Sequence, residues 1–209
     1  MGLSLSVREI GLFELYAAEL KKWNSKVNLT AITKDSEIAI KHFIDSLTLA
    51  PYLSAHDHLL DIGSGAGLPV IPLKIIRPDI QMTSVDAVGK KILFQRHIIR
   101  MLDLKKIESV HARIEDLHRT HCCAFSVITS RAFTRLDRFV ALAAPLLAEH
   151  GVLIAMKGEQ ASVEIADSAE GVTLSGFEVT SVHRYTLPRG MGERVLTCIK
   201  RSKPLQGEG

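Results

Sequence analysis

The sequence of 209 residues predicts an α/β fold built on a mostly parallel seven-stranded sheet. From about residue 58 onward, short β-branched runs alternate with segments in which apolar residues recur at helical spacing. Strand-helix alternation of this kind requires right-handed crossovers, so the strands lie parallel and helices cover both faces of the sheet. The last two strand-like runs instead follow each other through a turn at 187–190, which predicts an antiparallel hairpin at one edge.

The amino-terminal part of the chain shows helical patterns only. Apolar residues recur at helical spacing over residues 7–29, which indicates an amphipathic helix. A second helical stretch is expected at 35–50, where Asp35 can cap the amino terminus and Pro51 ends the helix. We therefore expect an amino-terminal helical extension over 1–55.

The remaining residues are expected to form one α/β domain over 56–203, followed by a disordered tail over 204–209. The expected strands cover 58–62, 80–86, 107–111, 125–130, 151–157, 177–186 and 194–200. The expected helices lie near 66–76, 88–103, 114–120 and 134–149.

The composition is that of an ordinary globular protein, with 46% hydrophobic and 23% charged residues. Cys122, Cys123 and Cys198 are too few for a disulfide framework, and the adjacent pair lacks the C-x-x-C spacing of zinc and redox sites. The sequence shows no signal-peptide pattern and no run approaching the roughly 20 apolar residues that span a bilayer. These observations favour a cytoplasmic protein without a membrane partner.

Positive charge is concentrated in two segments, although the net charge is only +3. Residues 88–113 hold seven basic residues against two acidic ones, and residues 184–203 hold six against one. Such segments are either solvated surface or a footprint for the phosphate backbone of a nucleic acid.

The most informative segment is a strand that runs into three alternate glycines and then a helix, at 59–69. Glycine lets the chain turn at positive φ and lets the backbone approach a ligand. A dinucleotide loop would place its third small residue at position 68, where Leu68 stands instead. The G-x-G-x-G spacing of Gly63, Gly65 and Gly67 better suits S-adenosylmethionine, and the alternative is a tight turn that binds no ligand.

Residues after the next two strands extend this pattern. Asp86 ends the second strand, where a carboxylate can accept both ribose hydroxyls of a nucleoside, or else cap the following helix. After the third strand, Ile114 can cover an adenine face beside polar neighbours such as Glu115, although an acidic helix start is the alternative.

Arg131 follows the fourth strand, where catalytic groups project from an open parallel sheet. Its planar guanidinium suits a carboxylate, a phosphate or a guanine edge, and the alternative is a surface ion pair. The Asn/Asp-Pro-Pro-aromatic sequence that positions an exocyclic amine is absent here, and so is a nucleophilic cysteine.

Taken together, these segments resemble the RsmG (GidB) family of bacterial small-subunit ribosomal RNA guanine-N7 methyltransferases, from about residue 23 to residue 200. The segments that carry the resemblance are Trp23-Asn24, Asn28-Leu29-Thr30-Ala31-Ile32, His42-Phe43-Ile44-Asp45-Ser46-Leu47, Leu60-Asp61-Ile62-Gly63-Ser64-Gly65-Ala66-Gly67-Leu68-Pro69, Ile71-Pro72-Leu73, Lys90-Lys91 with Phe94, Arg113 with Glu115, Ser130-Arg131-Ala132-Phe133, Lys157-Gly158, Tyr185 with Leu187-Pro188, and Glu193-Arg194. The sequence departs from the family at Val70, where glycine is usual, and at Ser126, where aspartate is common.

The resemblance implies a Rossmann-like class I methyltransferase fold and transfer of a methyl group from S-adenosylmethionine to a guanine N7 of 16S ribosomal RNA. The expected substrate is 16S ribosomal RNA or a precursor of the small ribosomal subunit, and the chain is expected to act as a monomer without a metal ion. The cofactor contacts that the resemblance implies are Gly63, Leu68, Ile114, Glu115 and Arg131. Gly65 and Gly67 from the loop and Asp86 from strand geometry complete the predicted cofactor site.

The expected RNA contacts are His42, Lys90, Lys91, Arg96 and Lys157. His42 and Asp45 fall three residues apart on the second helix, hence on one face, which favours a packing or capping role for the pair and leaves substrate contact as the alternative. A guanine N7 already owns a lone pair, so no general base is required and none is assigned. The remaining alternatives are a methyltransferase for a small molecule or a protein, a nicotinamide-dependent oxidoreductase, and a non-enzymatic RNA-binding module.

Overall fold

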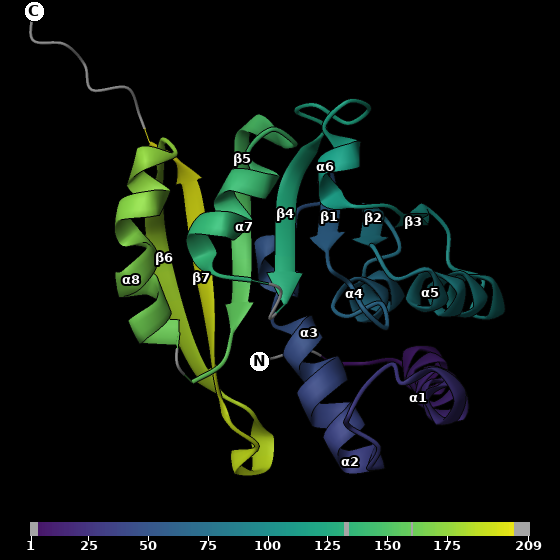
Figure 1. The fold of residues 1–209 in the computed structure, drawn as a ribbon. Coiled ribbons are helices and arrows are strands. Elements are labelled where there is room, and N and C mark those ends of the chain that lie inside the picture. The colour runs from purple at the N-terminus through teal and green to yellow at the C-terminus, as the bar shows by residue number, and fades with distance from the viewer. Residues whose placement is uncertain (1–3, 132–133, 160, 203–209) are drawn as a thin grey trace, which may run out of the picture.

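The computed structural model describes residues 4–131, 134–159 and 161–202, and in this part of the chain it contains the predicted seven-stranded sheet (Figure 1). The strands are β1 (His58–Ile62), β2 (Gln81–Asp86), β3 (Ile107–His111), β4 (Phe125–Arg131), β5 (Leu147–Lys157), β6 (Phe177–Thr186) and β7 (Glu193–Arg201). Their order is β3-β2-β1-β4-β5-β7-β6. The first five strands are parallel, and β7 is antiparallel to both of its neighbours, which confirms the predicted edge hairpin.

Alternate residues of the strands form two apolar layers, one on each face of the sheet, because successive side chains of a strand point in opposite directions. Leu59 packs with α1 (Val7–Val27), α4 (Val70–Ile76) and α5 (Gly89–Met101). The next residue, Leu60, packs with α6 (Ile114–Leu117), α7 (Leu136–Ala143) and α8 (Ala161–Leu174). The sheet is therefore covered on both faces, as the strand-helix alternation predicts.

The amino-terminal extension forms the two predicted helical stretches. Ser6 and Glu9 form a reciprocal capping box at the start of α1, which packs against α4 and α5. The second stretch consists of α2 (Asp35–Glu37), the π-helical segment η1 (Ile38–Ile44) and α3 (Asp45–Leu47), and a 3-10 turn, η2 (Ala50–Tyr52), follows. The prediction that Asp35 caps this stretch is wrong, because the capping position is Lys34 and Asp35 pairs with Lys21 at 2.6 Å.

Several predicted boundaries are also wrong. The helix expected from residue 66 begins at Val70, because the glycine loop occupies the preceding residues. The helices expected to reach 120 and 149 end at Leu117 and Ala143, and β5 begins at Leu147, four residues before the predicted start at 151. The expected tail over 204–209 lies outside the described residues.

Helix α8 was not predicted, since its pattern of apolar residues does not mark the face that it buries. The residues that it buries are Ala161, Ser168 and Val172, which are small or polar or isolated. Two of its apolar side chains point to solvent, with 65% of Val163 and 80% of Leu174 exposed, whereas Ile165 packs against the core. The buried positions keep helical spacing, but Ala161 and Ser168 add little hydrophobicity to it, so the periodic signal is weak.

The parallel strands end at one edge of the sheet, and the extension lies across that edge. Figure 1 shows the arrowheads of β4 and β5 pointing toward α3, with the β6–β7 hairpin turn on the same side. No helix in the described ranges is long and apolar enough to cross a membrane.

Candidate active site at the carboxyl edge of the sheet

The strand order reverses at β1, which pairs with β2 on one side and with β4 on the other. In open α/β sheets, this reversal produces a crevice at the carboxyl ends of the strands, where ligands bind. The glycine loop leads out of β1 at this point. Gly63, Gly65 and Gly67 have φ of 69°, 57° and 86°, which other residues adopt only under strain.

The backbone of the glycine loop packs closely against neighbouring residues. A Cβ atom built at Gly67 would collide with the side chain of Ile71. The backbone N–H of Gly65 donates a 2.9 Å hydrogen bond to Oδ2 of Asp86, which ties the loop to the end of β2. At Gly65 the positive φ rather than lack of space favours glycine, since a Cβ there would come no nearer than 4.0 Å to Gly63, and neither Gly65 nor Gly67 lines the cavity that the loop borders.

Asp86 accepts hydrogen bonds from two backbone groups, and its predicted contact with a ribose stays a prediction. Its Oδ1 accepts a 2.8 Å hydrogen bond from the N–H of Val88, the capping residue of α5, while Oδ2 accepts from Gly65. Each carboxylate oxygen has a second lone pair. Asp86 therefore remains able to accept hydrogen bonds from a ligand.

A cavity of about 400 Å³, here called the crevice cavity, lies against the loop. The residues that line it include Gly63, Asp86, Lys91, Ile114, Glu115 and Arg131. The structure thus brings together five of the predicted cofactor residues. Leu68 is not among them, because it is 4% exposed and packs in the apolar layer under the loop.

Asp61 lies at the base of the glycine loop and is fully buried. Its Oδ2 accepts a 3.4 Å hydrogen bond from the N–H of Val70, and its Oδ1 has no hydrogen-bond partner in the described part of the chain. Burial raises the pKa of Asp61 well above its usual value, opposed by that hydrogen bond and by the positive charge of Arg131. Asp61 does not line the crevice cavity, and the contact that it makes is the support of Val70 at the start of α4.

Arg131, at the end of β4, contacts the amino-terminal extension. Its Nη1 lies 3.6 Å from Oδ2 of Asp45 and donates a 3.2 Å hydrogen bond to the carbonyl of Lys41. Its Nη2 lies 3.4 Å from Nδ1 of His42. Arg131 is therefore not the surface ion pair that the sequence left open, since Asp45 and His42 are 3% and 5% exposed.

Asp45 also contacts two residues from the carboxyl-terminal part of the chain. The hydroxyl of Tyr185 on β6 donates a 2.9 Å hydrogen bond to its Oδ1, and Nε of Arg194 on β7 lies 3.6 Å from the same oxygen. Burial raises the pKa of Asp45, while the neighbouring Arg131 and Tyr185 act in the opposite direction. The sequence analysis placed neither Tyr185 nor Arg194 in the site.

A second cavity of about 340 Å³ lies on the other side of Arg131 and is here called the polar cavity. The residues that line it include Lys41, His42, Asp45, Arg131, Lys157 and Arg194. Nζ of Lys157 lies 2.6 Å from Oε1 of Glu164 and also donates to the carbonyl of Thr134. Residues 132–133, which belong to the Ser-Arg-Ala-Phe segment, lie outside the described part of the chain.

The five predicted RNA contacts do not form one surface. His42 and Lys157 line the polar cavity, whereas Lys91 lines the crevice cavity, 3.8 Å from Oδ2 of Asp86. Arg96 uses its guanidinium for the carbonyl of Ser109, with hydrogen bonds of 3.1 and 2.9 Å. Lys90 is exposed at the start of α5 and remains a predicted phosphate contact.

The extension also supports the glycine loop directly. The hydroxyl of Tyr16 on α1 donates a 2.5 Å hydrogen bond to the carbonyl of Ala66 within the loop. Tyr16 is fully buried, and its ring stacks on that of Phe43 with 5.1 Å between the centroids. The extension and the loop are thus packed as one unit.

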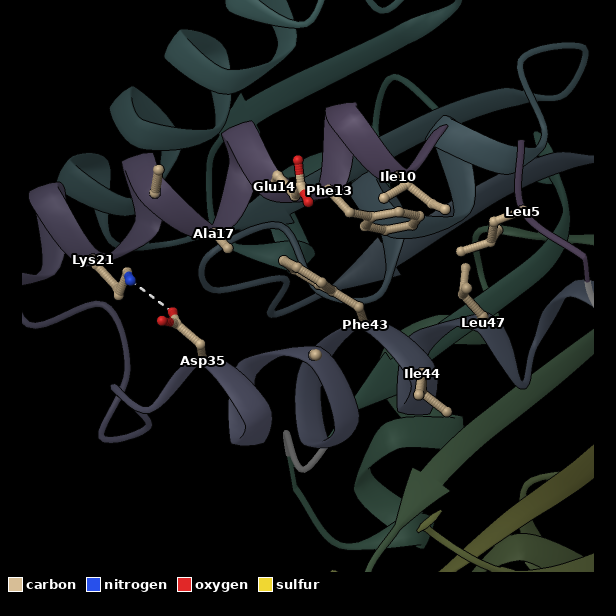
Figure 2. A pocket seen from close by; sticks show the side chains of 12 residues that line it. Leu5, Ile10, Phe13, Glu14, Ala17, Lys21, Asp35, Phe43, Ile44 and Leu47 are labelled. Carbon is tan, nitrogen blue, oxygen red and sulfur yellow. Dashed lines mark hydrogen bonds and ion pairs between the residues drawn. The ribbon is translucent and has the colours of Figure 1, made fainter. Parts of the chain in front are cut away.

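A third cavity, of about 500 Å³, lies away from the crevice between α1 and the helical stretch 35–47 (Figure 2). Its walls are mainly apolar and include Ile10, Phe13, Phe43, Ile44 and Leu47. Figure 2 shows the pair Lys21–Asp35 at one end of this cavity. Although it is larger than the crevice cavity, it offers few polar groups for a nucleoside, so we do not assign the reaction to it.

Comparison with known proteins identifies the family. The family model described as rRNA small subunit methyltransferase G matches residues 9–191. A protein of that name from Geobacter sulfurreducens is 49% identical over 200 residues, which cover 95% of this chain and 92% of the relative. The chain belongs to the rRNA small subunit methyltransferase G family.

More distant relatives agree with this assignment. The rRNA small subunit methyltransferase G of Roseiflexus sp. is 40% identical over 97% of this chain and 88% of its own length. The crystal structure of a SAM-dependent methyltransferase from Aquifex aeolicus superimposes with a TM-score of 0.61 at 13% identity, covering 87% of this chain and 97% of the other. The predicted Rossmann-like class I methyltransferase fold is confirmed.

As a member of the rRNA small subunit methyltransferase G family, the chain is an rRNA methyltransferase, and S-adenosylmethionine is its cofactor. The crevice fits this cofactor, since Gly63 lines it at a positive φ that lets the backbone approach a ligand and Asp86 presents acceptor oxygens. In the described residues, no group of three His, Cys, Asp or Glu side chains could hold a metal ion.

His42 gives this methyltransferase a predictable response to acid. Burial and the positive charge of Arg131 lower the pKa of His42 from 6.5 to about 4, so the imidazole is neutral in the folded protein at neutral pH. A lowered histidine pKa means that the unfolded chain takes up the proton first, so stability falls as the pH drops from 6.5 toward 4. When the pH is lowered from about 7.5 to about 5, protonation of this histidine in the unfolded chain should lower the free energy of unfolding by about 2 kcal/mol.

Urea denaturation of the wild type and of His42→Gln at these two pH values measures the effect. The variant cannot titrate at this position, so its stability should fall by about 2 kcal/mol less than that of the wild type over the same range. An equal fall in both proteins would show that His42 is not held neutral.

Proposed function

We propose that this rRNA methyltransferase transfers the methyl group of S-adenosylmethionine to N7 of a guanine in 16S ribosomal RNA, by direct in-line displacement. The observation that carries the proposal is the arrangement at the carboxyl edge, where the crevice cavity and the polar cavity share Arg131. The family supports methylation of small-subunit rRNA, and the resemblance of the sequence motifs supports guanine N7 as the target.

The residues proposed to hold the cofactor follow the order of the strands. Ile114 and Glu115 after β3 would contact the adenine, and the carboxylate of Asp86 at the end of β2 would accept hydrogen bonds from the ribose. The backbone of Gly63 after β1 and the guanidinium of Arg131 at the end of β4 would hold the amino-acid end. The side chain of Leu68 has no place in this scheme.

S-adenosylmethionine supplies a methyl group bonded to a positively charged sulfur. The in-plane lone pair of guanine N7 forms the new N–C bond, the electrons of the C–S bond remain on sulfur, and the positive charge passes to the purine. No proton is released at N7, so no general base is required. The neutral His42 therefore needs no proton-transfer role.

The rate must then come from positioning the two reactants. Holding reacting atoms about 3 Å apart and in line can contribute about 7–11 kcal/mol. Arg131 is itself fixed by the carbonyl of Lys41 and by Asp45, so it can orient a ligand without first being ordered.

The proposal is tested by incubating the purified protein with radiolabelled methyl donor and small ribosomal subunits from cells that lack this protein. Nucleoside analysis of the rRNA should show labelled N7-methylguanosine. Label on another nucleoside would contradict the N7 assignment. Label in protein or small molecules alone would favour the competing kind of methyltransferase.

A further inference from the structure

We propose that the polar cavity binds the target nucleotide as an unpaired guanosine, and that Asp45 recognises its base. This inference rests on the proposed function and adds a site, a specificity-determining residue and a substrate form to it. The evidence comes from the position of the cavity along the sheet edge, from its walls and from its depth.

The position of the polar cavity follows from the strand order β2-β1-β4-β5-β7. Along the carboxyl edge, the crevice cavity runs from Asp86 past Gly63 to Arg131, and the polar cavity continues from Arg131 to Lys157 and Arg194. A cofactor whose ribose lies at Asp86 directs its other end toward Arg131. The polar cavity is therefore the neighbouring space into which a methyl group can be delivered.

The walls of the polar cavity suit a nucleotide. Lys41, Arg131, Lys157 and Arg194 supply cationic donors, and Ile32 and Met156 supply apolar surface on which a base can rest. These four cations outnumber the carboxylates that pair with them, which are Glu37, Asp45 and Glu164. An excess of positive charge remains for an RNA phosphate.

Asp45 gives the cavity a preference for guanine. Its Oδ1 is engaged by Tyr185 and Arg194, whereas the only partner described for its Oδ2 is Arg131 at 3.6 Å. An ionised carboxylate only accepts hydrogen bonds. Guanine offers two adjacent donors, N1–H and the N2 amino group, whereas adenine presents an acceptor at N1, so Asp45 can bind the former edge and not the latter.

The depth of the cavity requires an exposed base. His42 and Asp45 form part of its lining and are 5% and 3% exposed, so a base must enter the protein to reach them. In an RNA duplex, the major groove is deep and narrow and the Watson–Crick edge is paired. Enzymes that act on such a base take it from a loop or extrude it from the helix. The target guanine must therefore be unpaired when it reacts.

Gly158 offers a way to block the cavity without disturbing the fold. It lines the polar cavity, and a Cβ built on it meets none of the described atoms within 4 Å. We expect Gly158→Leu to lower kcat/KM for rRNA by about 10-fold or more, because lost positioning of a reactant has effects of this size. The affinity for S-adenosylhomocysteine, measured by calorimetry, should stay within about 2-fold of the wild type, because that ligand occupies the other cavity.

The matched control is Gly11→Leu on α1, where a Cβ also meets none of the described atoms within 4 Å. This variant should methylate rRNA at the wild-type rate. Wild-type kcat/KM in Gly158→Leu would overturn the cavity assignment and leave the proposed function standing. Wild-type protein that binds S-adenosylhomocysteine but methylates no rRNA would overturn the proposed function itself.

Asp45 is tested with short RNA hairpins that carry the mapped target guanine in the loop or paired in the stem. The loop substrate should react and the stem substrate should not. Inosine at the target retains N7 but lacks the N2 amino group, so it should react about 10-fold more slowly, as for a lost hydrogen bond to a charged group. In Asp45→Asn, whose folding is verified by its melting temperature, the difference in rate between guanosine and inosine should shrink. An unchanged difference would refute the role of Asp45. Equal rates for the loop and stem substrates would refute the requirement for an unpaired base.

Discussion

Replacing Arg131 by glutamine is expected to lower kcat/KM for rRNA methylation by about 10²–10³-fold, the range found when a fixed catalytic-site donor is removed. The guanidinium borders both cavities and contacts Asp45, the carbonyl of Lys41 and His42 at once. Glutamine has two donors at one end and cannot reach these groups together. The loss therefore affects the placement of the cofactor, of the nucleotide and of the extension.

Arg131→Lys should recover little of this activity. Lysine keeps the positive charge, but its ammonium is a point donor and cannot replace a planar group that bonds in several directions. Recovery of activity to within about 3-fold of wild type would mean that charge alone matters at this position.

The matched control for these variants is Arg135→Gln. Arg135 precedes α7, has a side chain that is 60% exposed, and pairs with Asp137 at 3.4 Å. A surface change of this kind alters the free energy of unfolding by about 0.5 kcal/mol or less and should leave kcat/KM unchanged. Assays run at least about 15 °C below the melting temperature of each variant separate loss of activity from loss of structure. This margin is several times the drop in melting temperature that a destabilisation of about 1 kcal/mol causes.

The sheet could be predicted from the sequence because its signals are local. The parallel strands contain short apolar runs that lie between segments of helical periodicity, and the crossover rule then determines the parallel arrangement without further information. The failures occur where tertiary contacts replace a local signal. Helix α8 buries Ala161, Ser168 and Val172, which give only a weak apolar pattern. The centre of the 35–47 stretch is π-helical, which the spacing of its apolar residues does not predict.

The crevice could be predicted for the same reason, whereas the polar cavity could not. Gly63 and Asp86 lie at the ends of adjacent strands, so their proximity follows from the fold class. Asp45 and Tyr185 are separated by 140 residues, and nothing in either segment indicates that a carboxylate and a phenol will meet. The polar cavity exists only because the extension, β4 and the β6–β7 hairpin converge.

Arg96 shows why a basic residue in a basic segment is weak evidence for RNA binding. The strand order begins at β3, so this strand is an edge and its outer backbone groups have no partner strand. The guanidinium of Arg96 satisfies one of them, the carbonyl of Ser109. A count of charges along the sequence cannot separate such a residue from an exposed lysine such as Lys90.

Replacing Asp86 by asparagine is expected to weaken binding of S-adenosylhomocysteine by about 10²-fold, because each hydrogen bond to a charged group is worth about 1.5–3 kcal/mol and the ribose offers two hydroxyls. The change also disturbs the loop. Both carboxylate oxygens accept from backbone N–H groups, those of Gly65 and Val88. An amide has only one oxygen, so its NH₂ must face one of these donors, and either the loop loses its tie to β2 or the N–H of Val88, just before α5, loses its acceptor.

Calorimetric titration with S-adenosylhomocysteine measures this effect without depending on the RNA substrate. Asp79→Asn is the matched control, because Asp79 lies just before the amino end of the same strand, β2, and pairs with Arg77 at 2.9 Å on the surface. The control should bind like the wild type. Since the acid at the carboxyl end of β2 is the group assigned to the ribose, equal affinity of Asp86→Asn and wild type would place the nucleoside elsewhere and remove the basis for the order of contacts along the edge.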